Sequence, residues 1–303
     1  MPTSQTQALP TRTMSGIGYA MIGFSVFSMQ DAIVKWLVTS LPVWEILFIR
    51  SIIIMVIALA IAGPKSIPSI FTGPSRNALL LRSALILTAW ITYFTAAKSL
   101  HLAELVTIYF STPMFVILLS VFALKETVGA ARWIATIVGF TGIMIAANPS
   151  GTMEILPVIL TLIAAFCWAW TNILVRMISR TETTLTLMIA SNGLFIIACG
   201  AMLPFVWVTP DLFSIGLMVA LGVVGGLGQY FLFEGYRLAP ASAVAPFEYI
   251  TLIWAFVWGY LIWQDWPAER VFWGAGLILL SGLGLILVEN RAFRRRIASK
   301  SLP

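Results

Sequence analysis

Residues 42–62 read PVWEILFIRSIIIMVIALAIA, an almost unbroken apolar run in which Glu45 and Arg50 are the only charged residues. A helix needs about 20 mostly apolar residues to cross the hydrocarbon core of a bilayer, so this run predicts a transmembrane helix. Nine further stretches have the same character: residues 15–38, 77–97, 101–124, 130–147, 154–177, 183–203, 211–237, 240–263 and 268–289. The sequence therefore predicts an all-α integral membrane protein of ten transmembrane helices.

The composition of the whole chain agrees with a lipid environment. Of its 303 residues, 60% are hydrophobic and only 10% are charged, whereas a soluble domain usually carries about a quarter charged residues. So few polar side chains cannot cover a soluble globule of this size, which argues against a soluble enzyme. The two cysteines, Cys167 and Cys199, lie inside apolar runs and indicate small buried residues, not a disulfide framework.

The net charge of +6 comes from Lys and Arg residues that lie mainly between the apolar runs and after the last one. With the N-terminus in the cytoplasm, most of these cations fall on the cytoplasmic side, as the positive-inside rule requires. We therefore expect a multi-pass protein of a bacterial-type inner membrane, monomeric or homodimeric, with both termini cytoplasmic and no nucleic-acid partner. Residues 1–14 and 290–303 then form cytoplasmic tails around two halves, 15–147 and 154–289.

The two halves repeat the same landmarks at a nearly constant spacing. In each half an aromatic pair is followed by a Leu, an Ala, an acidic residue at the end of a span, a Trp and a Gly: Tyr93-Phe94, Leu100, Ala103, Glu126, Trp133 and Gly142, then Tyr230-Phe231, Leu238, Ala241, Asp265, Trp273 and Gly282. Each half holds five predicted helices, and because five is odd the second half enters the membrane the other way up. Inverted repeats are a recurring plan of transporters, with the substrate site near the midplane where the halves meet.

Two five-helix repeats, each closing with an acidic residue and then a helix that contains Trp and Gly, resemble the drug/metabolite transporter (DMT) superfamily, EamA type. The first hairpin, with Gln30-Asp31, Lys35-Trp36, Glu45 and Phe48-Ile49-Arg50, resembles members that take up S-adenosylmethionine or riboflavin. Other members export amino acids, including aromatic ones. The resemblance implies a secondary transporter that works by alternating access on a vitamin-like or cofactor-like metabolite, with an amino-acid or drug/metabolite exporter as the alternative.

Four charged residues of the first hairpin, Asp31, Lys35, Glu45 and Arg50, lie inside predicted spans. A charge near the bilayer centre costs about 2.5–3.5 kcal/mol on insertion scales, so such residues are expected to be paired or to face water. Counted from the helix ends, Lys35 matches Glu45 in depth and Asp31 nearly matches Arg50. These four either form a neutral staple between the first two helices, or share a member, Arg50 or Asp31, with the charged group of a substrate.

Further candidates lie in the later spans. Glu248 is a deep carboxylate that either serves substrate binding or proton or other ion coupling, or forms a buried pair with Arg82 or Arg176. Aromatic, amide and hydroxyl groups that could line a substrate cavity are Tyr109, Trp168, Asn172, Gln229 and Tyr230. Pro113 and Pro246 fall at corresponding places in the two repeats, either as hinges or as ordinary tolerated kinks, because proline frees backbone carbonyls within a helix.

The remaining motifs exclude other classes of site. Gly222, Gly225, Gly226 and Gly228 lie inside an apolar run, not at a strand-to-helix turn, so they indicate close helix packing and not a phosphate loop; the same holds for Gly139, Gly142, Gly282 and Gly284. The single histidine, His101, lacks companion ligands, so no metal site and no cofactor are expected. Without a cluster of catalytic residues at one membrane face, an integral-membrane transferase is a remote alternative, and we expect no enzyme.

Overall fold

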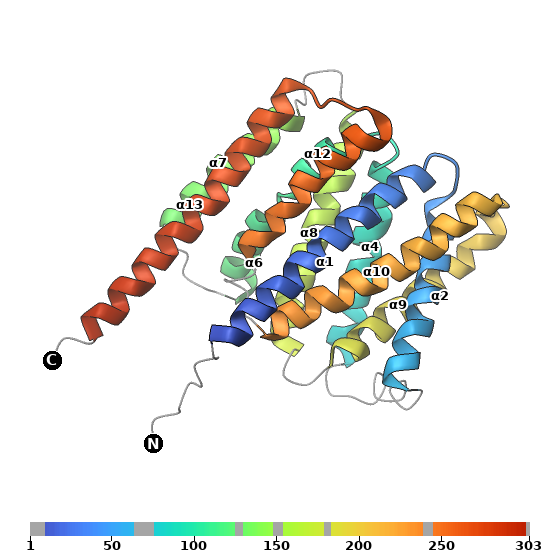
Figure 1. Ribbon diagram of the computed structural model, residues 1–303, viewed down its shortest axis with the longest axis horizontal. Helices are drawn as coiled ribbons and strands as arrows, with labels where there is room; N and C mark the ends of the chain where they lie inside the picture. Colours follow the sequence, from blue (N-terminus) through green and yellow to red (C-terminus); the bar gives the residue numbers. More distant parts are fainter. Residues whose placement is uncertain are drawn as a thin grey trace.

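A computed structural model describes residues 10–63, 76–124, 130–147, 154–178, 183–238 and 245–300, and every regular element within these ranges is a helix (Figure 1). The elements are α1 (Pro10–Leu37), α2 (Val43–Ala62), α4 (Arg76–Ala96), α5 (Leu102–Tyr109), α6 (Thr112–Leu124), α7 (Ala130–Ala147), α8 (Ile155–Ile178), α9 (Thr184–Val206), α10 (Leu212–Leu238), the 3₁₀ helix η1 (Ala245–Tyr249), α12 (Ile250–Trp263) and α13 (Glu269–Lys300). Each of the ten predicted stretches contains a helix, which confirms the all-α prediction.

The fourth predicted span, 101–124, is broken into α5 and α6. The physical reason is Pro113, the second residue of α6, because proline has no N–H to donate to the carbonyl four residues earlier, that of Tyr109. The Thr112 hydroxyl donates to that carbonyl instead, at 2.8 Å, so the break leaves no orphan acceptor there. The ninth span is interrupted at the corresponding place, where η1, which contains Pro246, gives way to α12. Whether these breaks act as hinges stays a prediction.

The first and last helices extend beyond their apolar runs into the predicted tails, whose cytoplasmic location stays a prediction. Helix α1 begins at Pro10, inside the expected tail 1–14, and α13 continues to Lys300 through most of the expected tail 290–303. The end of an apolar run marks where lipid contact stops, but the backbone ladder continues while the residues favour a helix. Residues 291–300 contain no Gly or Pro and are rich in Arg and Ala, which are good helix formers.

Five helical segments are long and apolar enough to cross a bilayer: Met14–Leu37, Val43–Ile61, Arg76–Ala96, Leu185–Val206 and Leu212–Leu232. Four shorter apolar helices accompany them, over Leu102–Val116, Trp133–Ala146, Ile155–Thr171 and Phe247–Trp263. Large apolar side chains such as Leu212 and Phe205 point outward, with 86% and 81% of their surface exposed. An outside of this kind is suited to lipid, because a soluble monomer rarely exposes large contiguous apolar patches.

The helix packing follows the division into two halves. The most extensive contacts pair α1 with α10, α4 with α8, α2 with α9, and α7 with α13. Exchanging each helix for its counterpart in the other half turns the α1–α10 pair into α8–α4 and leaves the other two pairs unchanged, which is the pattern that a pseudo-twofold axis produces. Both termini emerge at the same end of the bundle (Figure 1). The inverted insertion of the halves and the cytoplasmic location of the termini stay predictions.

Glycines let the paired helices approach closely, which confirms the packing prediction for most of them. A Cβ on Gly274 of α13 would come within 2.5 Å of the Gly142 carbonyl oxygen of α7, and one on Gly222 of α10 within 2.6 Å of Ile53 of α2. The prediction is wrong for Gly284, where a Cβ would meet nothing within 4 Å. Helix α10 therefore lies against both α1 and α2, and in Figure 1 it runs between them.

Candidate functional site

A cavity of about 100 Å³ lies inside the bundle. It is lined from six of the predicted spans, by Phe24, Phe27, Gln30 and Asp31 of α1, Ala89, Trp90 and Tyr93 of α4, Val106, Tyr109 and Phe110 of the α5 break, Trp168 of α8, Leu232 of α10, and Glu248 and Thr251 of η1 and α12. Four of the site residues predicted from the sequence thus meet in one place: Asp31, Tyr109, Trp168 and Glu248. Their role in binding stays a prediction.

Asp31 sits in an aromatic wall of this cavity. Its side chain lines the cavity together with that of Tyr93. The Tyr93 ring in turn meets the Tyr109 ring edge-on, with the centroids 5.1 Å apart. The rings of Phe110 and Tyr249 stack on each other, with their centroids 5.1 Å apart. These contacts hold the rings around the Asp31 carboxylate in place.

Glu248 supplies a second carboxylate from a different element. It lies in the five-residue 3₁₀ helix η1, and no side chain in the described part of the chain donates a hydrogen bond to its carboxylate. Arg82, one of the partners expected from the sequence, donates to the Ser191 hydroxyl at 3.0 Å, so that expectation is wrong. The side chain of the other expected partner, Arg176, lies outside the described residues.

The staple predicted between the first two helices is wrong as a set of ion pairs. Lys35 donates to the Leu100 carbonyl at 2.6 Å, and the Glu45 carboxylate accepts from the backbone N–H of Val208 at 3.1 Å. No ion pair joins Asp31 to Arg50 among the described side chains. Matching depths along a hairpin assumes that its two helices are neighbours, but α1 packs mainly on α10, and α2 on α9 and α10.

Arg50 nevertheless links α2 to the cavity wall through a residue that was not among the candidates. Its Nε and one terminal nitrogen donate to Gln30 Oε1 at 3.2 and 2.9 Å. Its Cζ lies 4.5 Å from the centroid of the Trp90 ring, a cation–π contact. Gln30 directly precedes Asp31, yet its sequence position gives no sign that it faces an arginine from another helix.

The remaining predicted site residues do not line this cavity. Tyr230 is 39% exposed and contacts the neighbouring ring of Phe231, and Gln229 has a buried Oε1 without a hydrogen-bond partner in the described structure. Asn172, Pro113 and Pro246 lie in described helices, but their side chains lie outside the described residues.

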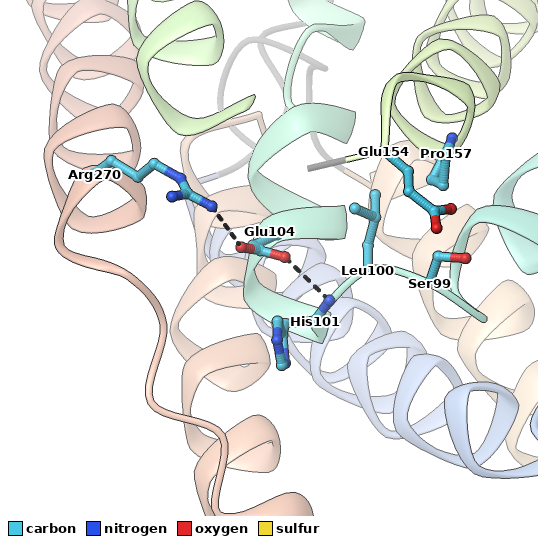
Figure 2. Close-up of a pocket in the computed structure, with 7 residues that line it drawn as sticks. All are labelled: Ser99, Leu100, His101, Glu104, Glu154, Pro157 and Arg270. Carbon is cyan, nitrogen blue, oxygen red and sulfur yellow. Dashed lines mark hydrogen bonds and ion pairs between the residues drawn. The ribbon is translucent and has the colours of Figure 1, made fainter. Parts of the chain in front are cut away.

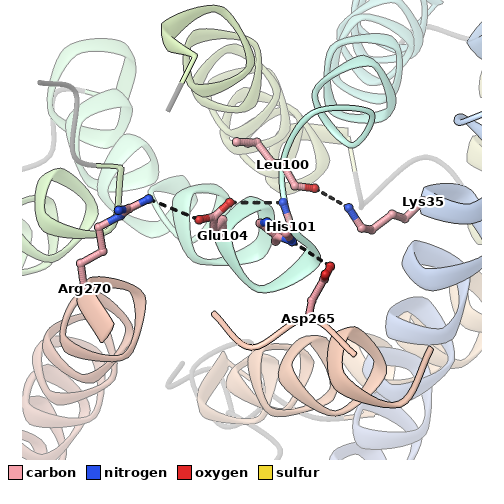
Figure 3. A network of polar contacts seen from close by, with 6 residues as sticks. All are labelled: Lys35, Leu100, His101, Glu104, Asp265 and Arg270. Carbon is pink, nitrogen blue, oxygen red and sulfur yellow. Dashed lines mark hydrogen bonds and ion pairs between the residues drawn. The ribbon is translucent and has the colours of Figure 1, made fainter. Parts of the chain in front are cut away.

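A second, more open pocket of about 390 Å³ lies around the start of α5 (Figure 2), and it includes Leu100, whose carbonyl accepts from Lys35. Its lining includes Glu104 and Arg270, whose side chains approach to 3.6 Å, while the Glu104 carboxylate also accepts from the backbone N–H of His101. The His101 ring pairs with Asp265 at 2.7 Å. As Figure 3 shows, these contacts join the start of α5 in the first half to the segment after α12 and to the start of α13 in the second.

Known proteins resemble this chain along nearly its whole length. The model of the EamA-like transporter family matches residues 14–148 and 155–287. The S-adenosylmethionine uptake transporter of Rickettsia conorii is 27% identical, over 95% of this chain and 97% of its own length. The riboflavin transporter of Rhizobium johnstonii is also 27% identical, over 94% and 95% of the two chains, as is the pseudopaline exporter CntI of Pseudomonas aeruginosa, over 89% and 95%.

The fold has a counterpart of known structure. One crystal structure matches with a TM-score of 0.64 and 17% identity, over 94% of this chain and 98% of the other, which shows a shared fold and nothing about substrate. Together with the apolar helices, the two family matches make this chain a multi-pass membrane protein of the transporter type. The chain belongs to the EamA-like transporter family, within the DMT superfamily.

Proposed function

We propose that this protein is a secondary-active transporter, working by alternating access, of a small amphiphilic metabolite that carries a positive charge and an aromatic ring, of the S-adenosylmethionine type. The observation that carries the proposal is one interior cavity that combines two carboxylates, Asp31 and Glu248, with the rings of Trp90, Trp168 and Tyr109.

The charge distribution favours a cationic substrate. A carboxylate held deep among transmembrane helices is costly, so its retention points to a role in binding or ion coupling. The nearest cation, Arg50, is already held by Gln30 and Trp90. A sulfonium or ammonium group would therefore find uncommitted negative charge at Glu248, and its own charge would also be attracted by the aromatic faces.

Riboflavin is the second candidate within the same class. The ring-rich wall suits its flat ring system, and a relative bears the name riboflavin transporter. Riboflavin carries no positive charge, however, so its hydroxyls and ring N–H would donate hydrogen bonds to the two carboxylates without neutralising their charge. The exporter among the relatives makes outward transport of an amino-acid or other metabolite the alternative direction.

The cavity must widen to hold such a substrate. Sites for small organic ligands usually measure about 300–1,000 Å³, against about 100 Å³ here. Tyr109 and Phe110 stand at the α5 break and Glu248 stands in η1, so movement at these two interruptions would change the cavity directly. We infer that they are the hinges of alternating access, with inverted halves and both termini in the cytoplasm.

Uptake into proteoliposomes tests the proposal. Labelled S-adenosylmethionine is offered with and without an imposed proton gradient, and riboflavin and amino acids are used as competitors. We expect Asp31→Asn and Glu248→Gln to weaken uptake about ten- to a hundredfold, since hydrogen bonds to charged groups contribute about 1.5–3 kcal/mol. Asp211→Asn, which changes an exposed carboxylate outside the cavity, serves as the control. Saturable uptake of riboflavin alone, or full activity of both cavity variants, would overturn the assignment.

A further inference from the structure

Gln30 is a fully buried amide whose orientation is fixed by its neighbour. Its side chain lines the cavity with 0% of its surface exposed. Two nitrogens of Arg50 donate to its Oε1. Because a guanidinium only donates and an amide NH₂ cannot accept, the oxygen must face Arg50 and the nitrogen must face elsewhere. The usual ambiguity between the two ends of a glutamine amide is therefore removed here.

The pair of Gln30 and Arg50 cannot easily shift. Gly225 of α10 lies against it, and a Cβ there would come within 2.5 Å of Gln30 Oε1 and 3.0 Å of Arg50 Nε. The Trp90 ring covers the guanidinium from α4. Elements from three neighbouring helices thus hold the amide in place, so that it acts as a rigid part of the cavity wall.

The amide nitrogen is left without a partner. Gln30 Nε2 is buried and has no hydrogen-bond partner in the described structure. A buried donor without an acceptor costs free energy, so native proteins rarely keep one without a reason. Here the donor belongs to a residue that lines a cavity. The positively charged Arg50 guanidinium, which donates to Oε1, polarises the amide and strengthens Nε2 as a donor.

We propose that Gln30 Nε2 donates a hydrogen bond to a carboxylate oxygen of the substrate, and so selects substrates that carry a carboxylate close to a cation. The inference rests on the proposed function and adds the chemistry of recognition to it. A carboxylate is favoured over a neutral carbonyl because the Arg50 guanidinium stands directly behind the amide. Asp31, which follows Gln30 in the chain, and Glu248, which lines the same cavity, then attract the cationic part of the same molecule.

A matched pair of ligands tests this assignment: S-adenosylmethionine and its decarboxylated analogue, which differ only in the α-carboxylate. Binding of each to the purified full-length protein is measured by thermal shift and by competition for uptake. We expect the wild type to prefer the carboxylate-bearing ligand by about 10- to 100-fold, the ratio that one hydrogen bond to a charged group supplies. In Gln30→Glu, an acceptor for Arg50 remains but the donor is lost, and the preference should disappear.

The control applies the same amide-to-carboxylate change at an exposed site, Asn77→Asp at the start of α4, and should keep the wild-type preference. Equal binding of the two ligands by the wild type, or an unchanged preference in Gln30→Glu, overturns the inference while leaving the proposed function standing. If neither ligand binds the wild type, both proposals fail. If Gln30→Glu does not fold, equal binding of the two ligands by the wild type still overturns the inference.

Discussion

Replacing Gly225 by alanine tests the packing that positions the cavity wall. The new methyl group would lie 2.5 Å from Gln30 Oε1, well inside any real contact distance, and its neighbours there are the amide and guanidinium that hold each other. Either α10 moves away or the Gln30–Arg50 hydrogen bonds break. If α10 moves away by about 0.5–1 Å, each van der Waals contact that it makes there loses about a quarter to a half of its energy.

The cost follows from these two routes. Overpacking a tight interface costs about 1–3 kcal/mol, and a lost hydrogen bond to a charged group about 1.5–3 kcal/mol. Alanine regains about 1 kcal/mol in helix propensity over glycine. Because either route costs about 1–3 kcal/mol and the gain in helix propensity offsets about 1 kcal/mol, we expect Gly225→Ala to lower the free energy of unfolding by up to about 2 kcal/mol net. Uptake should fall as well, because Gln30 is displaced.

Gly216→Ala is the matched control, since Gly216 lies in the same helix and a Cβ there would meet nothing within 4 Å. It should be neutral or slightly stabilising. Thermal unfolding of both variants in detergent, followed by uptake in proteoliposomes, measures the difference. If Gly225→Ala is as stable and as active as Gly216→Ala, then α10 does not hold the Gln30–Arg50 pair and the reasoning fails.

Three further changes probe separate contacts. Trp90→Leu should weaken uptake and cost about 0.5–2 kcal/mol, because it removes the aromatic face over Arg50; an unchanged melting temperature and affinity would contradict this. Hydrogen bonds from Ser214 hold the pKa of Asp211 below its ordinary value, so the stability it contributes is present above pH 3.8 and is lost as the pH falls through the lowered pKa. Asp211→Ala should therefore melt below the wild type at pH 7 and approach it as the pH falls below 3.8, and a constant difference in melting temperature would refute the contribution of the hydrogen bonds from Ser214 to Asp211. Glu104→Gln removes the charge that ties the start of α5 to α13; we expect a small loss of stability and a changed uptake rate, and an unchanged rate would show that this tie does not limit opening.

Much of the fold could be read from local patterns. The apolar run at residues 42–62 predicts a membrane helix on its own, because a bilayer requires a minimum length of apolar surface. Pro113 likewise marks a place where one backbone N–H is missing, but only the structure shows that the helix breaks there, since α9 continues through Pro204. Of the candidate site, Asp31 and Glu248 could be chosen because a carboxylate in an apolar span stands out in any sequence.

Partners across the bundle could not be read in this way. Counting depths along α1 and α2 paired Lys35 with Glu45, but the structure places α10 between the helices and gives each charge a backbone partner elsewhere. For the same reason the sequence places Gln30 in the first hairpin but not in the site, since its position in the cavity wall depends on Arg50 of another helix.

The sequence by itself determined the lipid environment of this protein and the positions of its helices, since each depends on the residues of one segment. Only the tertiary structure decided which spans are neighbours, and therefore that Asp31, Glu248 and Gln30 share one cavity while Lys35 and Glu45 do not. Hydrophobic length acts within a segment, whereas hydrogen bonds and ion pairs form between segments whose contact depends on the packing of all the others.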